Sequence, residues 1–86
     1  MPPKVSPDVV ARRLGDSAVL IRLTTNRIYE LNATGARLWD LLQTGSAVDT
    51  IVDCLTSEFE GSPDSIRADV DALLHRLRGE GLVVDE

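Results

Sequence analysis

The sequence predicts an α+β domain, in which a three-stranded antiparallel β-meander is followed by three helices, similar in outline to a winged helix-turn-helix. Between residues 9 and 31 lie short segments that are rich in β-branched residues or alternate between apolar and polar ones. From Ala33 onward the apolar residues recur at spacings of three and four, as on the buried face of a helix. Strands that precede helices in this order indicate an α+β fold.

The three strands are expected at Val9–Leu14, Ser17–Leu23 and Arg27–Leu31. Gly15-Asp16 is the turn signal between the first two, and residues 24–26 (Thr-Thr-Asn) separate the second from the third. Consecutive hairpins of this kind place the third strand at an outer edge of the sheet.

The third strand passes directly into a helix. Tyr29 and Leu31 fall on one side of this strand, and Ile28 and Glu30 fall on the other. Asn32 follows at once, and its short side chain can accept hydrogen bonds from the first free N–H groups of a helix. A strand that enters a helix without a loop fixes the angle between them. Its free edge then lies beside whichever helices pack on that face.

The first helix is expected from about Ala33 to Gln43, with Trp39 in the core and Gly45 as the stop residue. The second is expected to begin at Ser46, with Asp49 three residues later as a weak capping box. One apolar face identifies this second helix, formed by Val48, Ile51, Val52, Leu55 and Phe59.

The third helix has the clearest start signal, with Ser62 as the cap and Pro63 in the first turn. It is expected to run to Arg78 and to end in the Gly-Glu-Gly stretch at residues 79–81. Residues 82–84 then form a short strand or an extended tail. The apolar face of the third helix consists of Ile66, Val70, Leu73, Leu74 and Leu77.

Length and composition indicate one domain over residues 1–86, with residues 1–7 loose because they are rich in proline. No apolar run approaches the roughly 20 residues that cross a membrane, and the first residues lack an apolar signal core. The single cysteine, Cys54, excludes an internal disulfide. We therefore expect a cytoplasmic protein that has no membrane partner.

Few side chains are suited to catalysis. His75 and Cys54 are the only histidine and cysteine, and Cys54 lies beside the apolar face of the second helix, where it behaves as a small hydrophobic residue. A metal site would need two carboxylates in addition to this pair. No Gly-rich phosphate loop is present. We therefore expect no catalytic residues, no metal and no cofactor, and the chain is predicted not to be an enzyme.

The charge distribution argues against a nucleic-acid partner. Residues 1–43 carry six Lys/Arg and four Asp/Glu, a net +2, whereas residues 44–86 carry three and ten, a net −7. In a winged helix-turn-helix the third helix would read DNA, and its basic side chains are balanced by Asp64, Asp69 and Asp71. Affinity for DNA comes largely from neutralising phosphates, for which this half is poorly suited.

An exposed edge strand favours a different partner, an extended peptide. The unpaired N–H and C=O groups of an edge strand are a template for strand addition. If the third helix packs nearby, alternate peptide side chains would enter a groove between strand and helix, where Leu73 supplies an apolar wall and Asp69 and Arg76 supply polar anchors. The candidate peptide-binding residues are Arg27, Ile28, Tyr29, Glu30, Leu31, Asp69, Ala72, Leu73, Arg76 and Leu77.

Purely structural roles compete with this interpretation. Tyr29 is compatible with a place in the core with its hydroxyl at the rim. Asp69 is placed to pair with Arg67 or a backbone group, and Arg76 with Asp69 or Glu80. Leu73 is equally compatible with the core.

Motifs along most of the chain match those of a known family. They are Leu31-Asn32-Ala33-Thr34-Gly35-Ala36, Leu38-Trp39, the stop at Gly45, the helix with Val48, Ile51, Val52 and Leu55, then Asp69-Val70, Leu73, Leu77 and Gly81-Leu82-Val83. With these motifs, residues 9–84 resemble the PqqD family, the small domain also called the RiPP recognition element.

The resemblance implies a winged helix-turn-helix-like fold that binds the leader segment of a ribosomally made precursor peptide and delivers it to modifying enzymes. Gly35, Trp39 and the length look most like the recognition half of a split lasso-peptide leader-processing protein. Its implied partners are the leader, a separate cysteine leader peptidase and an ATP-dependent cyclase. The alternatives are a chaperone of the pyrroloquinoline quinone precursor, which more often has Cys-Asp-Gly where Gln43-Thr44-Gly45 stands here, and a small winged-helix DNA-binding regulator.

Overall fold

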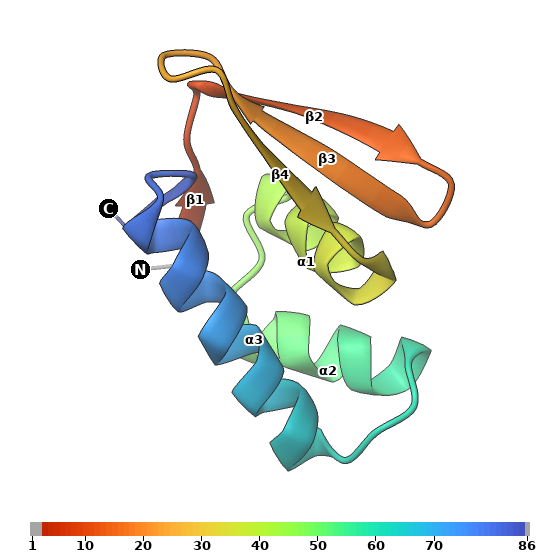
Figure 1. Cartoon of the computed structure of the whole chain (residues 1–86). Coiled ribbons are helices and arrows are strands. Elements are labelled where there is room, and N and C mark those ends of the chain that lie inside the picture. The colour runs from red at the N-terminus through yellow and green to blue at the C-terminus, as the bar shows by residue number, and fades with distance from the viewer. Residues whose placement is uncertain (1–2, 86) are drawn as a thin grey trace.

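A computed structural model describes residues 3–85 (Figure 1). The elements in these residues are, in chain order, β1 (Pro3–Val5), β2 (Val9–Leu14), β3 (Ser17–Arg22), β4 (Arg27–Leu31), α1 (Ala33–Gln43), α2 (Val48–Glu58), α3 (Pro63–Gly79) and β5 (Val83–Asp85). The predicted order of three strands followed by three helices is confirmed. Of the two forms expected for residues 82–84, the chain adopts the short strand, β5, and β1 is a further strand that was not predicted.

The predicted meander forms one antiparallel sheet in the order β2-β3-β4. Its first hairpin closes at Leu14 opposite Ser17, and Gly15 takes the positive φ of +61° that such a tight turn requires. In the second hairpin Tyr29 lies opposite Leu20 and Leu31 opposite Ala18. Within residues 3–85 no strand pairs with the outer side of β4, so the prediction that this strand lies at the edge is confirmed.

The prediction that residues 1–7 are loose is wrong for the part that the structure describes. β1 pairs antiparallel with β5, Val5 lies opposite Val83, and Pro3 is fully buried. A proline is tolerated at the first residue of a strand, where a backbone donor is not needed for the ladder. The pairing provides hydrogen-bond partners for backbone N–H and C=O groups of β5. Residues 1, 2 and 86 lie outside the described part of the chain.

The helix ends follow local capping chemistry where a cap is present. Asn32 accepts a hydrogen bond from the Gly35 N–H at 2.9 Å, as predicted for α1, and the Ser62 hydroxyl accepts one from the Ser65 N–H at 3.1 Å at the start of α3. The predicted capping box of α2 is wrong. This helix begins after Ala47 with no side-chain cap, because the Ser46 hydroxyl bonds Thr44 instead.

The core lies between the sheet and the helices. In Figure 1 α1 lies beneath the sheet, and α3 runs from the far end of α2 back toward β1 and β5. Trp39 is 2% exposed, so its predicted core position is confirmed. The other fully enclosed large side chains include Leu20, Leu38, Leu42, Ile51, Leu55, Leu74 and Leu82.

Gly81 is required where α3 turns into β5. Its φ is +76°, and a Cβ at this position would lie 2.8 Å from the Arg22 guanidinium carbon. We therefore expect Gly81→Ala to lower the free energy of unfolding by about 1–2 kcal/mol, the cost of a left-handed conformation for an L-residue. The displaced guanidinium would also lose its bond to the Glu80 carbonyl.

Urea denaturation measures this effect, and Gly79→Ala is its matched control. Gly79 is helical, and nothing lies within 4 Å of its added Cβ, so that variant should be as stable as the parent or slightly more so. Equal stability of the two variants would contradict a conformational requirement at Gly81.

Candidate functional site

The backbone of β4 presents unpaired hydrogen-bonding groups along its outer edge. In β3 the two-residue hairpin directs the backbone N–H and C=O groups of the odd-numbered residues toward β2. The Leu23 N–H continues this pattern by donating a hydrogen bond to the Asp8 carbonyl at 2.9 Å. Antiparallel strands alternate these directions strictly, so the even-numbered residues of β3 face β4. Their partners in β4 are the odd-numbered residues. The N–H and C=O groups of Ile28 and Glu30 therefore point away from the sheet.

A hollow of about 360 Å³ lies between the C-terminal end of β4 and one face of α3, and we call it the β4–α3 hollow. Its apolar wall includes Val70 and Leu73 of α3, with Leu38 of α1 and Leu55 of α2. Its other lining residues are Glu30, Leu31, Asn32, Thr34, Gly35, Asp69 and Arg76.

Half of the candidate residues predicted from sequence line this hollow, namely Glu30, Leu31, Asp69, Leu73 and Arg76. Leu73 is half-buried rather than enclosed, so its side chain still reaches the surface. The remaining candidates do not line it, namely Arg27, Ile28, Tyr29, Ala72 and Leu77.

Each of these exceptions has a structural reason. The Ile28 side chain is 66% exposed on the opposite face of the sheet, so only its backbone faces the edge. Leu77 is 2% exposed and belongs to the core. Ala72 is an exposed residue of α3. The side chains of Arg27 and Tyr29 both contact the Glu80 carboxylate at the end of α3.

Sequence reasoning missed several residues that line the hollow. Asn32 was interpreted only as a helix cap, and Thr34 and Gly35 only as parts of a family motif, although all three line the hollow. Val70 lies one turn before Leu73, so helical spacing was a signal that could have identified it. Leu38 and Leu55 form the floor, and no local signal distinguishes them from other core leucines.

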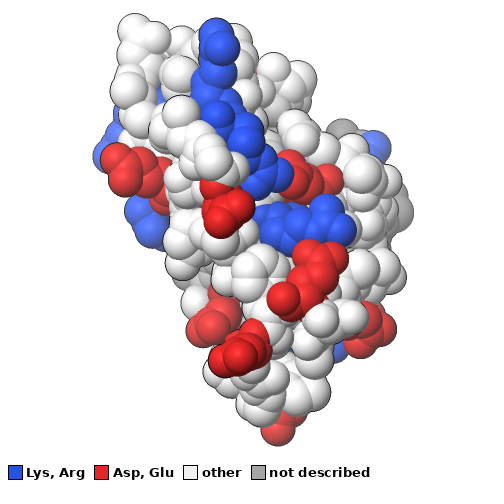
Figure 2. Space-filling model, turned by 90° about the vertical axis from the view of Figure 1, so that its right-hand side faces the viewer, with Lys and Arg blue, Asp and Glu red and all other residues white. Residues whose placement is uncertain are grey.

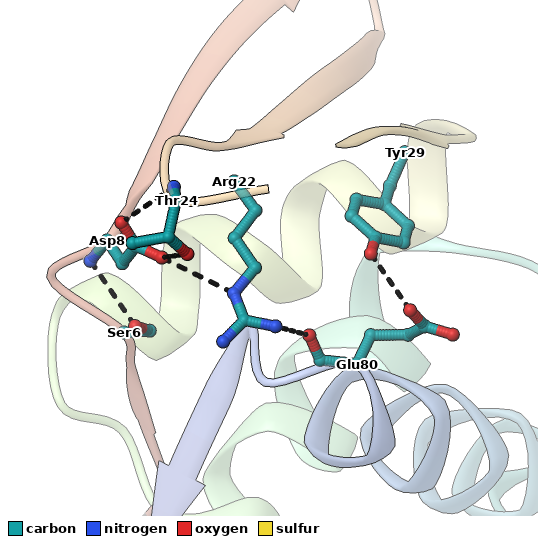
Figure 3. A network of polar contacts seen from close by, with 6 residues as sticks. All are labelled: Ser6, Asp8, Arg22, Thr24, Tyr29 and Glu80. Atoms are coloured by element: carbon teal, nitrogen blue, oxygen red, sulfur yellow. Dashed lines mark hydrogen bonds and ion pairs between the residues drawn. The ribbon is translucent and has the colours of Figure 1, made fainter. Parts of the chain in front are cut away.

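Glu80 holds the N-terminal end of β4 against the end of α3 (Figure 3). The Tyr29 hydroxyl donates a hydrogen bond to Glu80 Oε2 at 2.8 Å, and Arg27 Nη1 lies 3.5 Å from the same oxygen. Partial burial raises the pKa of Tyr29 above its ordinary value, and the hydrogen bond and charge of Glu80 raise it further. Neither Tyr29 nor Glu80 lines the β4–α3 hollow, so their contact marks its end on this side.

A second set of polar contacts ties this end to the rest of the sheet. Arg22 Nη1 donates to the Glu80 carbonyl at 2.9 Å, and Arg22 Nε lies 3.3 Å from Asp8 Oδ2. The Thr24 hydroxyl donates to the same Asp8 oxygen at 2.5 Å, and the Asp8 N–H donates to the Ser6 hydroxyl at 3.3 Å. As Figure 3 shows, these contacts join the turn between β1 and β2, the turn between β3 and β4, and the end of α3. They fix the position of α3 relative to β4.

Two charges beside the hollow stand apart from the ion pairs of the molecule. Within residues 3–85 the side chains of Asp69 and Arg76 make neither an ion pair nor a hydrogen bond. Arg67 binds Asp49 at 2.6 Å, and Glu80 binds Tyr29 and Arg27. Two of the structural partners considered from the sequence, Arg67 for Asp69 and Glu80 for Arg76, are therefore engaged elsewhere.

The surface lacks a continuous basic patch on the face shown in Figure 2, where Lys/Arg and Asp/Glu side chains are interspersed. Arg37 pairs with Glu58 at 2.8 Å, and Arg13 pairs with Asp40. No helix in residues 3–85 is long and apolar enough to cross a membrane. The same residues contain no group of three or more His, Cys, Asp or Glu side chains placed to hold a metal ion.

The fold and the hollow define a winged helix-turn-helix-like recognition domain in which the free edge of β4 lies beside the third helix. The chain belongs to the PqqD family, since the family model described as "Coenzyme PQQ synthesis protein D (PqqD)" matches residues 17–83.

Two solved structures are similar over nearly the whole chain. TbiB1 in complex with the TbiA(beta) leader peptide is 30% identical, with a TM-score of 0.90 over 96% of each chain. A lasso peptide synthetase B1 complexed with the leader peptide is 22% identical, with a TM-score of 0.88 over 99% of this chain and 100% of that one. No curated protein matches the chain significantly.

Proposed function

We propose that this chain binds the leader segment of a ribosomally synthesised precursor peptide by strand addition to β4 beside α3. The observation that carries the proposal is the outward direction of the Ile28 and Glu30 backbone groups directly next to the β4–α3 hollow. Backbone pairing supplies affinity for an extended peptide. The hollow receives a side chain of this peptide that points toward α3. The two similar solved structures, each a complex with a leader peptide, support the same function here.

The protein then acts without catalytic groups of its own. It presents the bound leader to a separate cysteine leader peptidase and to an ATP-dependent cyclase, as in lasso peptide biosynthesis. We place this activity in the cytoplasm, where ribosomal precursors are made, and the single cysteine, Cys54, fits a reducing compartment.

A second candidate is the chaperone of the pyrroloquinoline quinone precursor. The description of the matching family model favours it. The likeness to two leader complexes, one of them of a lasso peptide synthetase B1, favours the lasso-peptide function instead. A panel that contains both kinds of precursor leader separates the two candidates by affinity.

Fluorescence polarisation with the labelled leader encoded beside this chain tests the proposal, with the TbiA(beta) leader as a second probe. We expect dissociation constants in the nanomolar to micromolar range. Raising the salt from 50 to 200 mM should change them less than about threefold, because apolar and backbone contacts release few counterions.

A DNA duplex serves as the competing probe. A DNA-binding protein would lose about 1,000-fold or more in affinity over the same range of salt. No leader binding below about 100 μM, or tight salt-sensitive binding to the duplex, would overturn the proposal.

A further inference from the structure

Three residues of α3 stand in a row along the β4–α3 hollow. Asp69, Leu73 and Arg76 all line it, and their spacing of four and three places them on one face of the helix. With a rise of 1.5 Å per residue, Leu73 lies about 6 Å along the axis from Asp69 and about 4.5 Å from Arg76. Figure 1 shows that α3 runs in the opposite sense to β4, so a strand added to β4 also runs alongside α3.

The repeat of an extended peptide matches this row. Side chains on the same side of a strand recur about every 6.6 Å. When one inward side chain faces Leu73, the inward side chains two positions before and after it come approximately level with Asp69 and Arg76. The middle side chain enters the apolar part of the hollow, and the outer two meet one carboxylate and one guanidinium.

Both charges are available to a ligand. Arg13, Arg22, Arg27, Arg37 and Arg67 each pair with a carboxylate, whereas Arg76 makes no side-chain ion pair or hydrogen bond within residues 3–85. Asp69 is likewise unpaired in those residues. Arg76 thus offers an anion site in a chain whose net charge is −5.

We propose that the groove selects leaders by three alternate side chains: a basic one at Asp69, an apolar one in the hollow against Leu73, and an acidic one at Arg76. This inference rests on the proposed function and specifies the peptide chemistry that the same site accepts. Because the two charges have opposite signs, the order of base and acid in the bound peptide also reports the direction of the added strand. A base at the N-terminal position corresponds to pairing antiparallel to β4.

Selection from a display library of random dodecapeptides on the immobilised full chain tests this inference. The selected peptides should share an apolar residue with Asp or Glu two positions to one side and Lys or Arg two positions to the other. The Arg76→Glu variant should select a basic residue in place of the acidic one. For a peptide selected on the parent chain, this charge reversal should weaken binding about tenfold, as expected for the loss of an exposed attraction and its replacement by repulsion.

Arg12→Glu is the matched control. Arg12 is also exposed and without a side-chain partner in residues 3–85, but it lies in β2 and does not line the hollow. That variant should select the same peptides as the parent. Peptides that bind without the charge pattern, or a pattern that Arg76→Glu leaves unchanged, would overturn this inference and leave leader binding intact. Failure to enrich any peptide, together with no binding of the encoded leader, would overturn the proposed function itself.

Discussion

Replacing Leu73 with aspartate should abolish leader capture and leave the domain folded. Leu73 is half-buried and lines the β4–α3 hollow, so its carboxylate replacement can remain hydrated in the free protein. A bound leader would cover that carboxylate with an apolar side chain and leave it without a partner. Such burial costs about 3 kcal/mol or more, which corresponds to a loss of affinity of about 100-fold or more.

Leu77→Asp is the control for this substitution, because Leu77 lies one turn further along α3 but is 2% exposed. The same aspartate there should unfold the protein, and circular dichroism distinguishes the two outcomes. Unchanged leader affinity in Leu73→Asp, measured by fluorescence polarisation, would show that the leader does not occupy the hollow. Unfolding of Leu73→Asp would instead assign Leu73 to the core.

Replacing Ile28 with proline should weaken leader binding about tenfold to 100-fold without unfolding the sheet. The Ile28 N–H points away from β3, so its removal leaves the meander intact, as proline requires of an edge strand. The leader carbonyl that this N–H would bind is then buried without a donor, which costs about 1–3 kcal/mol.

Ile28→Ala keeps the N–H and removes most of a side chain that is 66% exposed on the other face, so it should bind the leader normally. Amide hydrogen exchange provides an independent measurement on the parent chain. Leader binding should newly protect the N–H groups of Ile28 and Glu30, because those of the odd-numbered residues of β4 already bond β3. Leader binding without protection at Ile28 would contradict strand addition at this edge.

Local signals were sufficient to predict much of the fold. Gly15-Asp16 indicated the first hairpin, and Asn32 and Ser62 indicated the starts of α1 and α3, because turns and caps depend on a few neighbouring residues. β1 was missed because Pro3 is a weak strand signal and its partner lies at the other end of the chain. The start of α2 was misplaced because Ser46 resembles a cap but bonds Thr44.

The candidate site was predictable to the extent that it depends on strand edges and helix faces. Leu73 was recognised as a candidate groove residue, but no spacing rule separates it from the buried Leu77 on the same helix. The difference in exposure between Leu73 and Leu77 depends on where α3 crosses the sheet. The contacts of Glu80 with Arg22 and Tyr29 hold α3 in this position. Those contacts join parts of the chain more than 50 residues apart, a distance over which sequence patterns carry no signal.

The pairing of β1 with β5 determines how the domain responds to mechanical force. Pro3 lies opposite Asp85, so the outer ends of both strands are at the same end of this two-stranded sheet. A force that pulls residues 3 and 85 apart acts along the interstrand hydrogen bonds and loads them one pair at a time. The strands then unzip at low force, followed by the bond from the Ser6 N–H to the Leu82 carbonyl. Beyond this bond, the ion pair of Arg22 with Asp8 and the bond of Arg22 to the Glu80 carbonyl still join the end of α3 to the sheet.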